Sequence, residues 1–384
     1  MNRRRLLAAL GAGVAGLAGC SGSSSTNATR EAFTLSPTPT PQRGQVGSVE
    51  IPVPRSELDQ PLPRDAIPAI VDPVFAEDWS GLTVPDSSPY DGGPLLPADA
   101  PVLGVEREGA DRAYPLRVLD WHEVVNDTFA GPLLVTYCPL CGSGVTAERR
   151  VDGEETVFGV SGRLWRDDLV MYDRATESLW SQILGAAIRG PRAGERLSLV
   201  PSSLTSWGEW QDTHPETRVL LPPPRSNTVS GRDATYDYFT PKYTYEGDQL
   251  IGRTGGARGQ PAERRFVVGV ERDGQARAYP FDVVVEEGVV NDRVGDLPVV
   301  VTTTPGDTLV AYDRRVEGST LRFETDDAAH LRAGGSRWER ATGRAVDGPH
   351  EGRRLDSATD TGPMFWKGWR NFHPDTSIYD EESD

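Results

Sequence analysis

Short apolar runs recur along this chain, separated by turn-forming Gly, Pro, Asp and Asn residues. Within the runs, apolar and polar positions alternate or β-branched residues dominate. This pattern is typical of many short β-strands joined by turns. Clear examples are residues 102–106, 133–137, 155–160, 168–173, 266–271, 297–303 and 308–313.

Helical patterns are few. We expect helices within residues 120–125, 202–215 and 361–374, the second with an N-cap at Ser202 or Ser203. The chain is therefore predicted to form a β-rich α+β fold with few short helices.

One module occurs twice in the sequence. LGVEREGADRAYPLRVL at 103–119 matches VGVERDGQARAYPFDVV at 268–284, and WQDTHPET at 210–217 matches WRNFHPDT at 369–376. The equivalent single residues include Tyr114 and Tyr279, Asn126 and Asn291, Trp180 and Trp338, and His214 and His373. The repetition predicts a tandem duplication that folds into two halves related by a pseudo-twofold axis.

The repeats set the expected organisation of the chain. The predicted segments are a lipoprotein signal peptide at 1–19, a disordered Ser/Thr/Pro-rich tether at 20–62, a first repeat at 63–221, an aromatic connector at 222–265 and a second repeat at 266–380.

The first 20 residues have the composition of an export signal. Three arginines precede an apolar run of 13 residues (6–18), which is too short for a membrane-spanning helix of ~20 residues. The paired arginines indicate twin-arginine export, and the LAGC ending resembles a lipobox. We expect an extracytoplasmic protein that Cys20, once lipidated, anchors to the cell membrane.

The charge balance excludes one class of partner. The formal net charge is -17, and lysine occurs only at Lys242 and Lys367. No basic stripe is present, so nucleic acid is not an expected partner. Acid excess with scarce lysine is typical of a salt-adapted, halophilic surface; it says nothing about a substrate, and protein or small-molecule partners stay open.

Only the first repeat carries a cysteine pair, Cys138 and Cys141 in VTYCPLCGS, and Thr304 replaces Cys138 in the second. Four interpretations compete. A structural disulfide is natural outside the cytoplasm, but so small a loop stabilises by only about 2 kcal/mol. Dithiol redox exchange is the second, although the following Gly-rich segment is a poor helix start for a thioredoxin-like site.

Metal binding is the third interpretation. CPLCG resembles the knuckles of rubredoxins and zinc ribbons, but the chain offers no second knuckle. His122 lies in the same repeat, whereas Glu287 takes its place in the second. Cys138, Cys141 and His122 would suit zinc or copper. The fourth interpretation is covalent catalysis, with a cysteine nucleophile, His122 as base and Glu123 or Asp168 orienting it.

Other first-repeat residues are candidates to line the same pocket. They are Trp121, Glu123, Ser161, Arg163, Trp165 and Asp167. We expect Cys138, Cys141 and His122 to converge on one partly exposed pocket, with Asp168 as a further catalytic candidate.

The blocks WHEVVND, VTYCPLCGS, FGVSGRL, DLVMYDRATESLWSQ and GPRAGERL together resemble the domain-of-unknown-function family numbered 3179, which occurs in bacteria and archaea. The likeness runs from AIPAIVDPVF to the segment before HPDT, over about residues 65–380. The resemblance implies that the family's Cys pair, its WHE histidine and its Asp before LVMYD correspond to Cys138, Cys141, His122 and Asp168. It implies no established activity.

Two functions follow as hypotheses. The first is an extracytoplasmic protein with a metal-binding or thiol-redox site at the cysteine pair. The alternative is a non-enzymatic cell-surface module that binds a ligand, in which the pair is only a disulfide.

Overall fold

The computed structural model describes residues 44–46, 49–107, 109–229, 236–246, 249–252, 257–258, 265–305, 308–359 and 361–379. Strands dominate it, which confirms the β-rich α+β fold. The helices, four α and two 3-10 in this part of the chain, are α1 (Leu116–His122), α2 (Trp207–Thr213), α3 (Phe281–Glu287), α4 (Trp366–Phe372), η1 (Arg55–Glu57) and η3 (Gly348–His350). No helix among these residues is long and apolar enough to cross a membrane.

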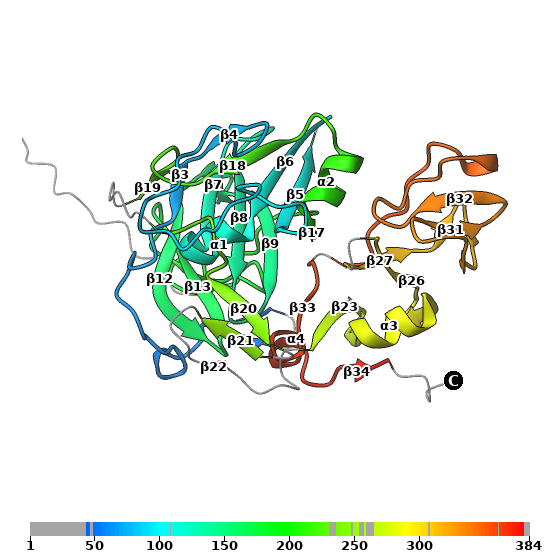
Figure 1. The fold of residues 1–384 in the computed structure, drawn as a ribbon. Coiled ribbons are helices and arrows are strands. Elements are labelled where there is room, and N and C mark those ends of the chain that lie inside the picture. The colour runs from blue at the N-terminus through cyan, green and yellow to red at the C-terminus, as the bar shows by residue number, and fades with distance from the viewer. Residues whose placement is uncertain are drawn as a thin grey trace, which may run out of the picture. The chain divides into compact units, whose positions relative to one another are not determined.

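Two sheets form the centre of the first half (Figure 1). The six-stranded sheet has, in spatial order, β16 (Leu199–Val200), β9 (Ser143–Glu148), β8 (Leu133–Cys138), β7 (Val124–Asp127), β3 (Ile70–Asp72) and β19 (Asn227–Thr228). The five-stranded sheet has β17 (Ser203–Ser206), β5 (Pro101–Arg107), β6 (Ala110–Pro115), β18 (Arg218–Leu221) and β4 (Val74–Ala76). One buried cluster joins the two sheets and includes Leu103, Tyr114, Leu119 and Val135.

A third sheet of the first half packs near the cysteines. It has the order β12 (Phe158–Trp165), β13 (Asp168–Asp173), β14 (Leu179–Ser181) and β15 (Ala186–Arg189). Two hairpins complete this half: β1 (Gly44–Val46) with β2 (Val49–Ile51), and β10 (Arg150–Val151) with β11 (Glu154–Glu155). The third sheet shares a second buried cluster with both cysteines and with Trp369 of α4.

The second half contains smaller sheets. The first sheet has the order β33 (Met364–Phe365), β23 (Phe266–Arg272), β24 (Gln275–Pro280) and β34 (Ser377–Ile378), and the second has β25 (Val289–Val294), β26 (Leu297–Thr303) and β27 (Leu309–Asp313). The third sheet pairs β28 (Arg315–Val316) with β29 (Ser319–Thr320). The fourth has the order β30 (Glu324–Thr325), β31 (His330–Ala333) and β32 (Ser336–Glu339). The connector adds β20 (Tyr243–Glu246), β21 (Gln249–Gly252) and β22 (Ala257–Arg258).

The same contacts recur in both halves. The Tyr114 hydroxyl donates to Asp127 over 2.6 Å, and the Tyr279 hydroxyl donates to Asp292 over 2.8 Å. Other recurring contacts are the bonds of Asn126 to the Phe158 backbone and of Asn291 to the Phe323 backbone, and the stacking of Trp210 on His214 and of Trp369 on His373. The duplication itself stays a prediction, which these paired contacts support.

Most predicted strands agree with the structure, but the run at 155–160 covers the end of β11, a two-residue break and the start of β12. The helices are displaced. The helix expected at 120–125 begins four residues earlier, as α1. In the segment 202–215, β17 takes the first residues, so the N-cap is Ser206, which accepts the Glu209 N–H. Pairing with β5 satisfies the backbone of residues 203–206 and delays the helix.

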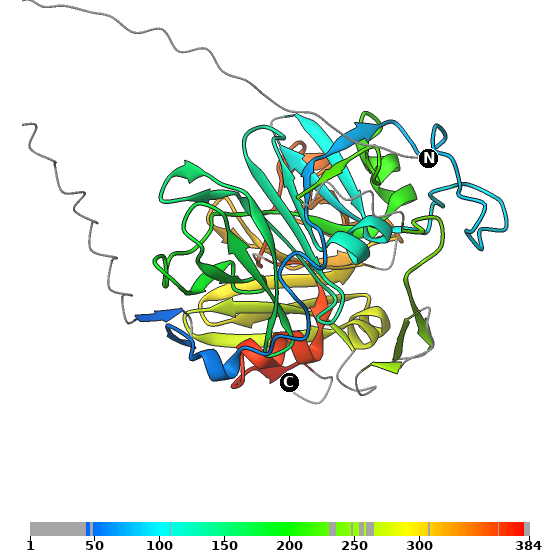
Figure 2. The same ribbon diagram turned by 90° about the vertical axis from the view of Figure 1, so that its left-hand side faces the viewer.

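The predicted tether boundary at residue 62 is wrong for the segment from 49 onward. Here Val49 and Ile51 of β2 are buried, as are Val53 and Leu58 on either side of η1. Alternation of apolar residues between the prolines lets this segment pack on the cysteine-containing cluster. Figure 2 shows the blue η1 segment beside the red α4. The predicted signal peptide and Cys20 lie outside the described residues.

Candidate functional site

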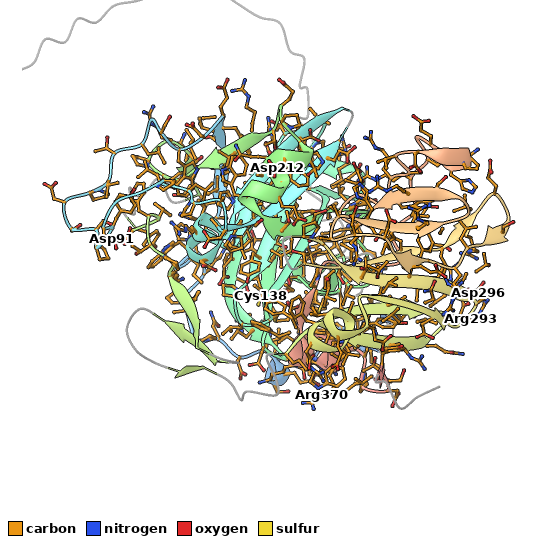
Figure 3. The ribbon with its side chains drawn as sticks, turned by 45° about the vertical axis from the view of Figure 1, so that its right-hand side comes forward. Asp91, Cys138, Asp212, Arg293, Asp296 and Arg370 are labelled. Carbon is orange, nitrogen blue, oxygen red and sulfur yellow. The ribbon has the colours of Figure 1, made fainter. Side chains whose placement is uncertain are left out.

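The two cysteines lie in the tight turn that joins β8 to β9 (Figure 3). Cys138 is the last residue of β8, and its carbonyl accepts the Cys141 N–H over 3.2 Å. Gly142 follows with a φ of 60°, a conformation that glycine adopts without steric cost. A Cβ atom there would lie 2.9 Å from the Phe365 ring, so this position has no room for a side chain.

Both cysteines are free thiols, and their sulfurs lie within hydrogen-bonding distance. Cys138 Sγ and Cys141 Sγ lie 3.1 Å apart, whereas a disulfide bond measures ~2.0 Å. The Asp167 carbonyl oxygen lies 3.3 Å from Cys141 Sγ and 3.8 Å from Cys138 Sγ. Each cysteine is only 2% exposed. The prediction of a partly exposed pocket is therefore wrong, because the two cysteines lie in a closed, buried site.

Asp168 brings a carboxyl group to the sulfurs. It is the first residue of β13 and is fully buried. One carboxylate oxygen of Asp168 and the two sulfurs all lie within 4.8 Å of one another. The carboxylate accepts the Ser181 hydroxyl over 2.5 Å and, more weakly, the Ile183 N–H over 3.3 Å.

The surroundings of Asp168 and Cys141 favour the protonated, neutral form of each group. Burial raises the pKa of Asp168 to about 8, although the hydrogen bonds from Ser181 and nearby N–H groups oppose the shift. The pKa of the Cys141 thiol is raised well above its ordinary value by its hydrogen bond with Cys138, by burial and by the nearby Asp168 and Asp167 carboxylates. Cys141 is thus the thiol that keeps its proton.

Ser181 and Gln182 support the site, and sequence reasoning did not select them. Gln182 accepts the Ser143 hydroxyl over 2.9 Å and donates to Thr136 over 3.1 Å, which ties β8 and β9 to the segment after β14. The second repeat has Glu339 and Arg340 at the equivalent positions after the shared tryptophan. Ser181 and Gln182, like the cysteines, therefore occur only in the first repeat.

The tip of the β12–β13 hairpin aims a carbonyl at the sulfurs. Arg166 and Asp167 have φ values of 55° and 66°, which are typical of a two-residue type I′ turn. Pairing of Trp165 with Asp168 closes this turn. The turn fixes the Asp167 carbonyl near the thiols, while its carboxylate forms an ion pair with Lys367 over 2.8 Å.

The second half covers the cysteine turn. The Phe365 N–H donates to the Cys141 carbonyl over 2.8 Å, and Gly368 of α4 packs against Cys141. Arg166 and Asn371 exchange two side-chain-to-backbone bonds of 2.8 and 2.7 Å. These contacts, from residues far apart in sequence, exclude solvent from the sulfurs.

The structure does not bring His122 to the cysteines. Its Nδ1–H donates to the Pro68 carbonyl over 2.7 Å, and its Nε2 accepts the Tyr238 hydroxyl over 2.8 Å. Burial lowers the pKa of His122 to about 4, so the ring is neutral and both nitrogens are engaged. The predicted ligand set of Cys138, Cys141 and His122 is corrected here: Asp168 stands where the histidine was expected.

Trp121 and Glu123 belong to the environment of His122 as well. Trp121 stacks on Tyr236 with ring centroids 4.4 Å apart. Glu123 ends α1 in the left-handed region, and burial raises its pKa to about 7. Neither is among the groups that the structure places at the sulfurs.

Three further candidates have structural roles in β12. The Ser161 hydroxyl donates to the Val170 carbonyl over 2.5 Å and accepts the Arg163 N–H over 3.1 Å, at a shift in strand register. Trp165 packs edge-on against Phe372 and donates to Glu57. These residues hold the hairpin whose tip reaches the thiols, without reaching them themselves.

The assembled donor set permits two kinds of chemistry. Two thiols 3.1 Å apart can be oxidised together, and a neighbouring carboxyl group can take up or release the proton. Two sulfurs and one carboxylate oxygen are also donors that zinc accepts.

The family model described as a protein of unknown function, DUF3179, matches residues 64–376. No curated protein and no solved structure matches the chain.

Proposed function

The chain belongs to the DUF3179 family, and because that description assigns no activity, we propose from the site itself that the protein carries a dithiol–disulfide redox centre. One observation carries the proposal: two free thiols lie 3.1 Å apart in a single turn. Closing a disulfide from this separation needs a movement of about 1 Å, so the turn can hold either redox state.

Asp168 supplies the proton chemistry that such a centre needs. A carboxyl group whose pKa is about 8 exchanges protons near neutral pH, where general acid–base groups are most effective. Cys141 keeps its proton, so Cys138 provides the first attacking sulfur. Asp168, which is protonated at neutral pH, donates its proton to the leaving partner thiolate and takes up the Cys141 proton in exchange.

The proposed reaction is exchange with a disulfide of a partner molecule. Cys138 sulfur attacks one partner sulfur, which forms a mixed disulfide; the released partner thiolate takes the proton that Cys138 loses. Cys141 sulfur then attacks Cys138 Sγ and passes its proton by way of Asp168 to the second partner thiolate. Two electrons and two protons leave the protein, and one partner disulfide becomes two thiols.

A chromogenic aromatic disulfide, 5,5′-dithiobis(2-nitrobenzoate), tests this sequence. In protein with Cys20→Ser, so that no third thiol contributes, we expect two equivalents of aromatic thiolate and an internal disulfide. Cys141→Ser should release one equivalent and retain the mixed disulfide. Asp168→Asn should slow the second release by roughly tenfold or more. Two releases without an internal disulfide, seen by peptide mass spectrometry, would contradict the proposal.

A metal site is the second candidate, favoured by the three donors of Cys138, Cys141 and Asp168 within 4.8 Å. These residues would hold zinc or copper, with a fourth ligand still required for a closed tetrahedral zinc site. Metal analysis of protein purified without chelator decides between the two. Stoichiometric metal that is lost in both Cys138→Ser and Asp168→Asn would replace the redox proposal.

The cellular location is a separate proposal that rests on the sequence. The arginine-led apolar segment and the LAGC ending support export and lipid anchoring through Cys20. The Cys20→Ser protein should leave the membrane fraction or fail to mature. A cleaved Cys20→Ser form that stays membrane-bound would refute the anchor.

A further inference from the structure

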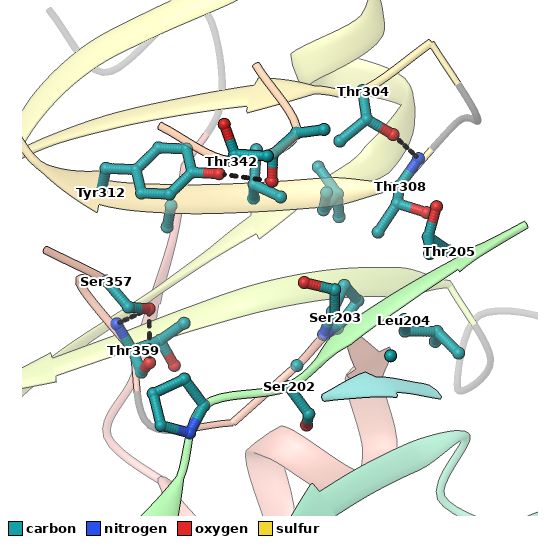
Figure 4. Close-up of a pocket in the computed structure, with 18 of the residues that line it drawn as sticks. Ser202, Ser203, Leu204, Thr205, Thr304, Thr308, Tyr312, Thr342, Ser357 and Thr359 are labelled. Atoms are coloured by element: carbon teal, nitrogen blue, oxygen red, sulfur yellow. Dashed lines mark hydrogen bonds between the residues drawn. The ribbon is translucent and has the colours of Figure 1, made fainter. Parts of the chain in front are cut away.

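A cleft of about 370 Å³ lies away from the cysteines, between the two halves (Figure 4). The first half contributes β17 and α2, and the second half contributes β27 and the segment that leads into β33. Its volume falls in the range of small-molecule sites, which often lie at such junctions. None of the groups proposed for thiol chemistry lines it.

Hydroxyl groups crowd this cleft, and several of them already donate to acceptors of the protein. Thr205 and Thr304 both donate to Glu209 Oε2, the latter over 3.0 Å. Ser357 donates to the Thr359 carbonyl over 2.7 Å, and the Thr359 hydroxyl donates to the Thr361 carbonyl over 3.1 Å. Each of these oxygens keeps lone pairs and can accept a further hydrogen bond from a ligand.

The side chains that line the cleft have a negative formal net charge. Among its described lining residues, the carboxylates of Glu106, Glu209 and Asp356 outnumber one guanidinium, that of Arg354. Arg354 is already paired with Glu106 over 2.7 Å. Three negative formal charges and one positive formal charge leave these four residues with a net charge of -2.

Glu209 has unused hydrogen-bonding capacity. Its Oε2 receives two hydroxyls, whereas its Oε1 is buried without a partner among the described residues. An unpaired buried carboxylate oxygen costs free energy that a donor would recover.

We propose that this cleft binds a small aliphatic amine in its ammonium form. An ammonium group has three donors and no acceptor, which complements acceptor oxygens and negative charge. The alkyl part would lie against apolar lining side chains such as Leu204, Val268 and Val310. A neutral polyol of equal length lacks the charge, and a dicarboxylate has the wrong sign.

Calorimetric titration with 1,4-diaminobutane, 1,4-butanediol and succinate tests this assignment at moderate ionic strength, where contacts with exposed carboxylates are screened. The full chain should bind the diamine at one site and neither of the other probes. Glu209→Gln should weaken diamine binding by roughly tenfold or more, because it removes the charge from the acceptor. Asp356→Asn, measured in parallel, should also weaken it.

Glu154→Gln is the matched control, since Glu154 is exposed and lies outside the cleft. It should leave the diamine affinity unchanged. Circular dichroism confirms that each variant is folded; if Glu209→Gln is not, Asp356→Asn decides alone. Equal binding of diol and diamine, or equal affinity of the cleft variants and Glu154→Gln, would overturn the proposal.

Discussion

At Asp168, burial and hydrogen bonding act in opposite directions on one carboxyl group. Burial disfavours the charged form, and the bonds from Ser181 and Ile183 favour it. Burial wins, and the pKa rises to about 8. The group therefore carries a proton over much of the range in which an unfolded aspartate has lost it.

This pKa shift predicts how stability depends on pH. Between about pH 4 and pH 8 the folded protein binds a proton at Asp168 that the unfolded chain does not, so the contribution of Asp168 to stability falls as pH rises. Relative to Asp168→Asn, the reduced protein should lose up to about 1.4 kcal/mol per pH unit in this window. Denaturant unfolding under reducing conditions at a series of pH values measures the difference. A flat difference would show that Asp168 is charged in the fold.

Some residues of the site were predictable from sequence and others were not. Cys138, Cys141 and Asp168 stand out because the second repeat lacks the cysteines and because they adjoin recognisable strands. His122 shares that asymmetry, but its contacts with Pro68 and Tyr238 depend on segments far along the chain. Residue type and spacing cannot reveal such long-range partners.

At the scale of elements, the β8–β9 turn depends on a glycine. Gly142 has a φ of 60°, and the Phe365 ring fills the space where a Cβ would lie. The apolar run at 133–137 predicted β8, in which every residue is buried. The helices shifted because β17 and α1 obey pairing and packing constraints that the local pattern does not contain.

Gly142→Ala should loosen the cover over the thiols. The left-handed conformation and the contact with Phe365 together should cost about 2–4 kcal/mol of unfolding free energy, and displacement of the ring should speed alkylation of Cys138 and Cys141. Gly153→Ala is the matched control: Gly153 has a φ of 79°, and a Cβ added there would meet no atom within 4 Å. It should cost only about 1 kcal/mol and leave alkylation unchanged. Equal alkylation rates in both variants would mean that Phe365 does not protect the thiols.

At the scale of the whole chain, one half carries the thiols and the other half covers them. The recurring Tyr–Asp, Asn–backbone and Trp–His contacts give both halves a common framework. Phe365 and α4 of the second half close over Cys141. A disulfide of a partner protein can reach the sulfurs only if these contacts open. Opening of these contacts should therefore accompany oxidation or reduction of the thiols.

A redox titration shows whether Cys138 and Cys141 form a dithiol–disulfide couple. The Cys20→Ser protein would be equilibrated in dithiol–disulfide buffers of graded potential, alkylated, and analysed by peptide mass spectrometry for the bond between Cys138 and Cys141. We expect one reversible two-electron transition, with a tenfold change in the oxidised-to-reduced ratio for about every 30 mV. Thiols that stay reduced across the whole range, or that oxidise independently of each other, would contradict it.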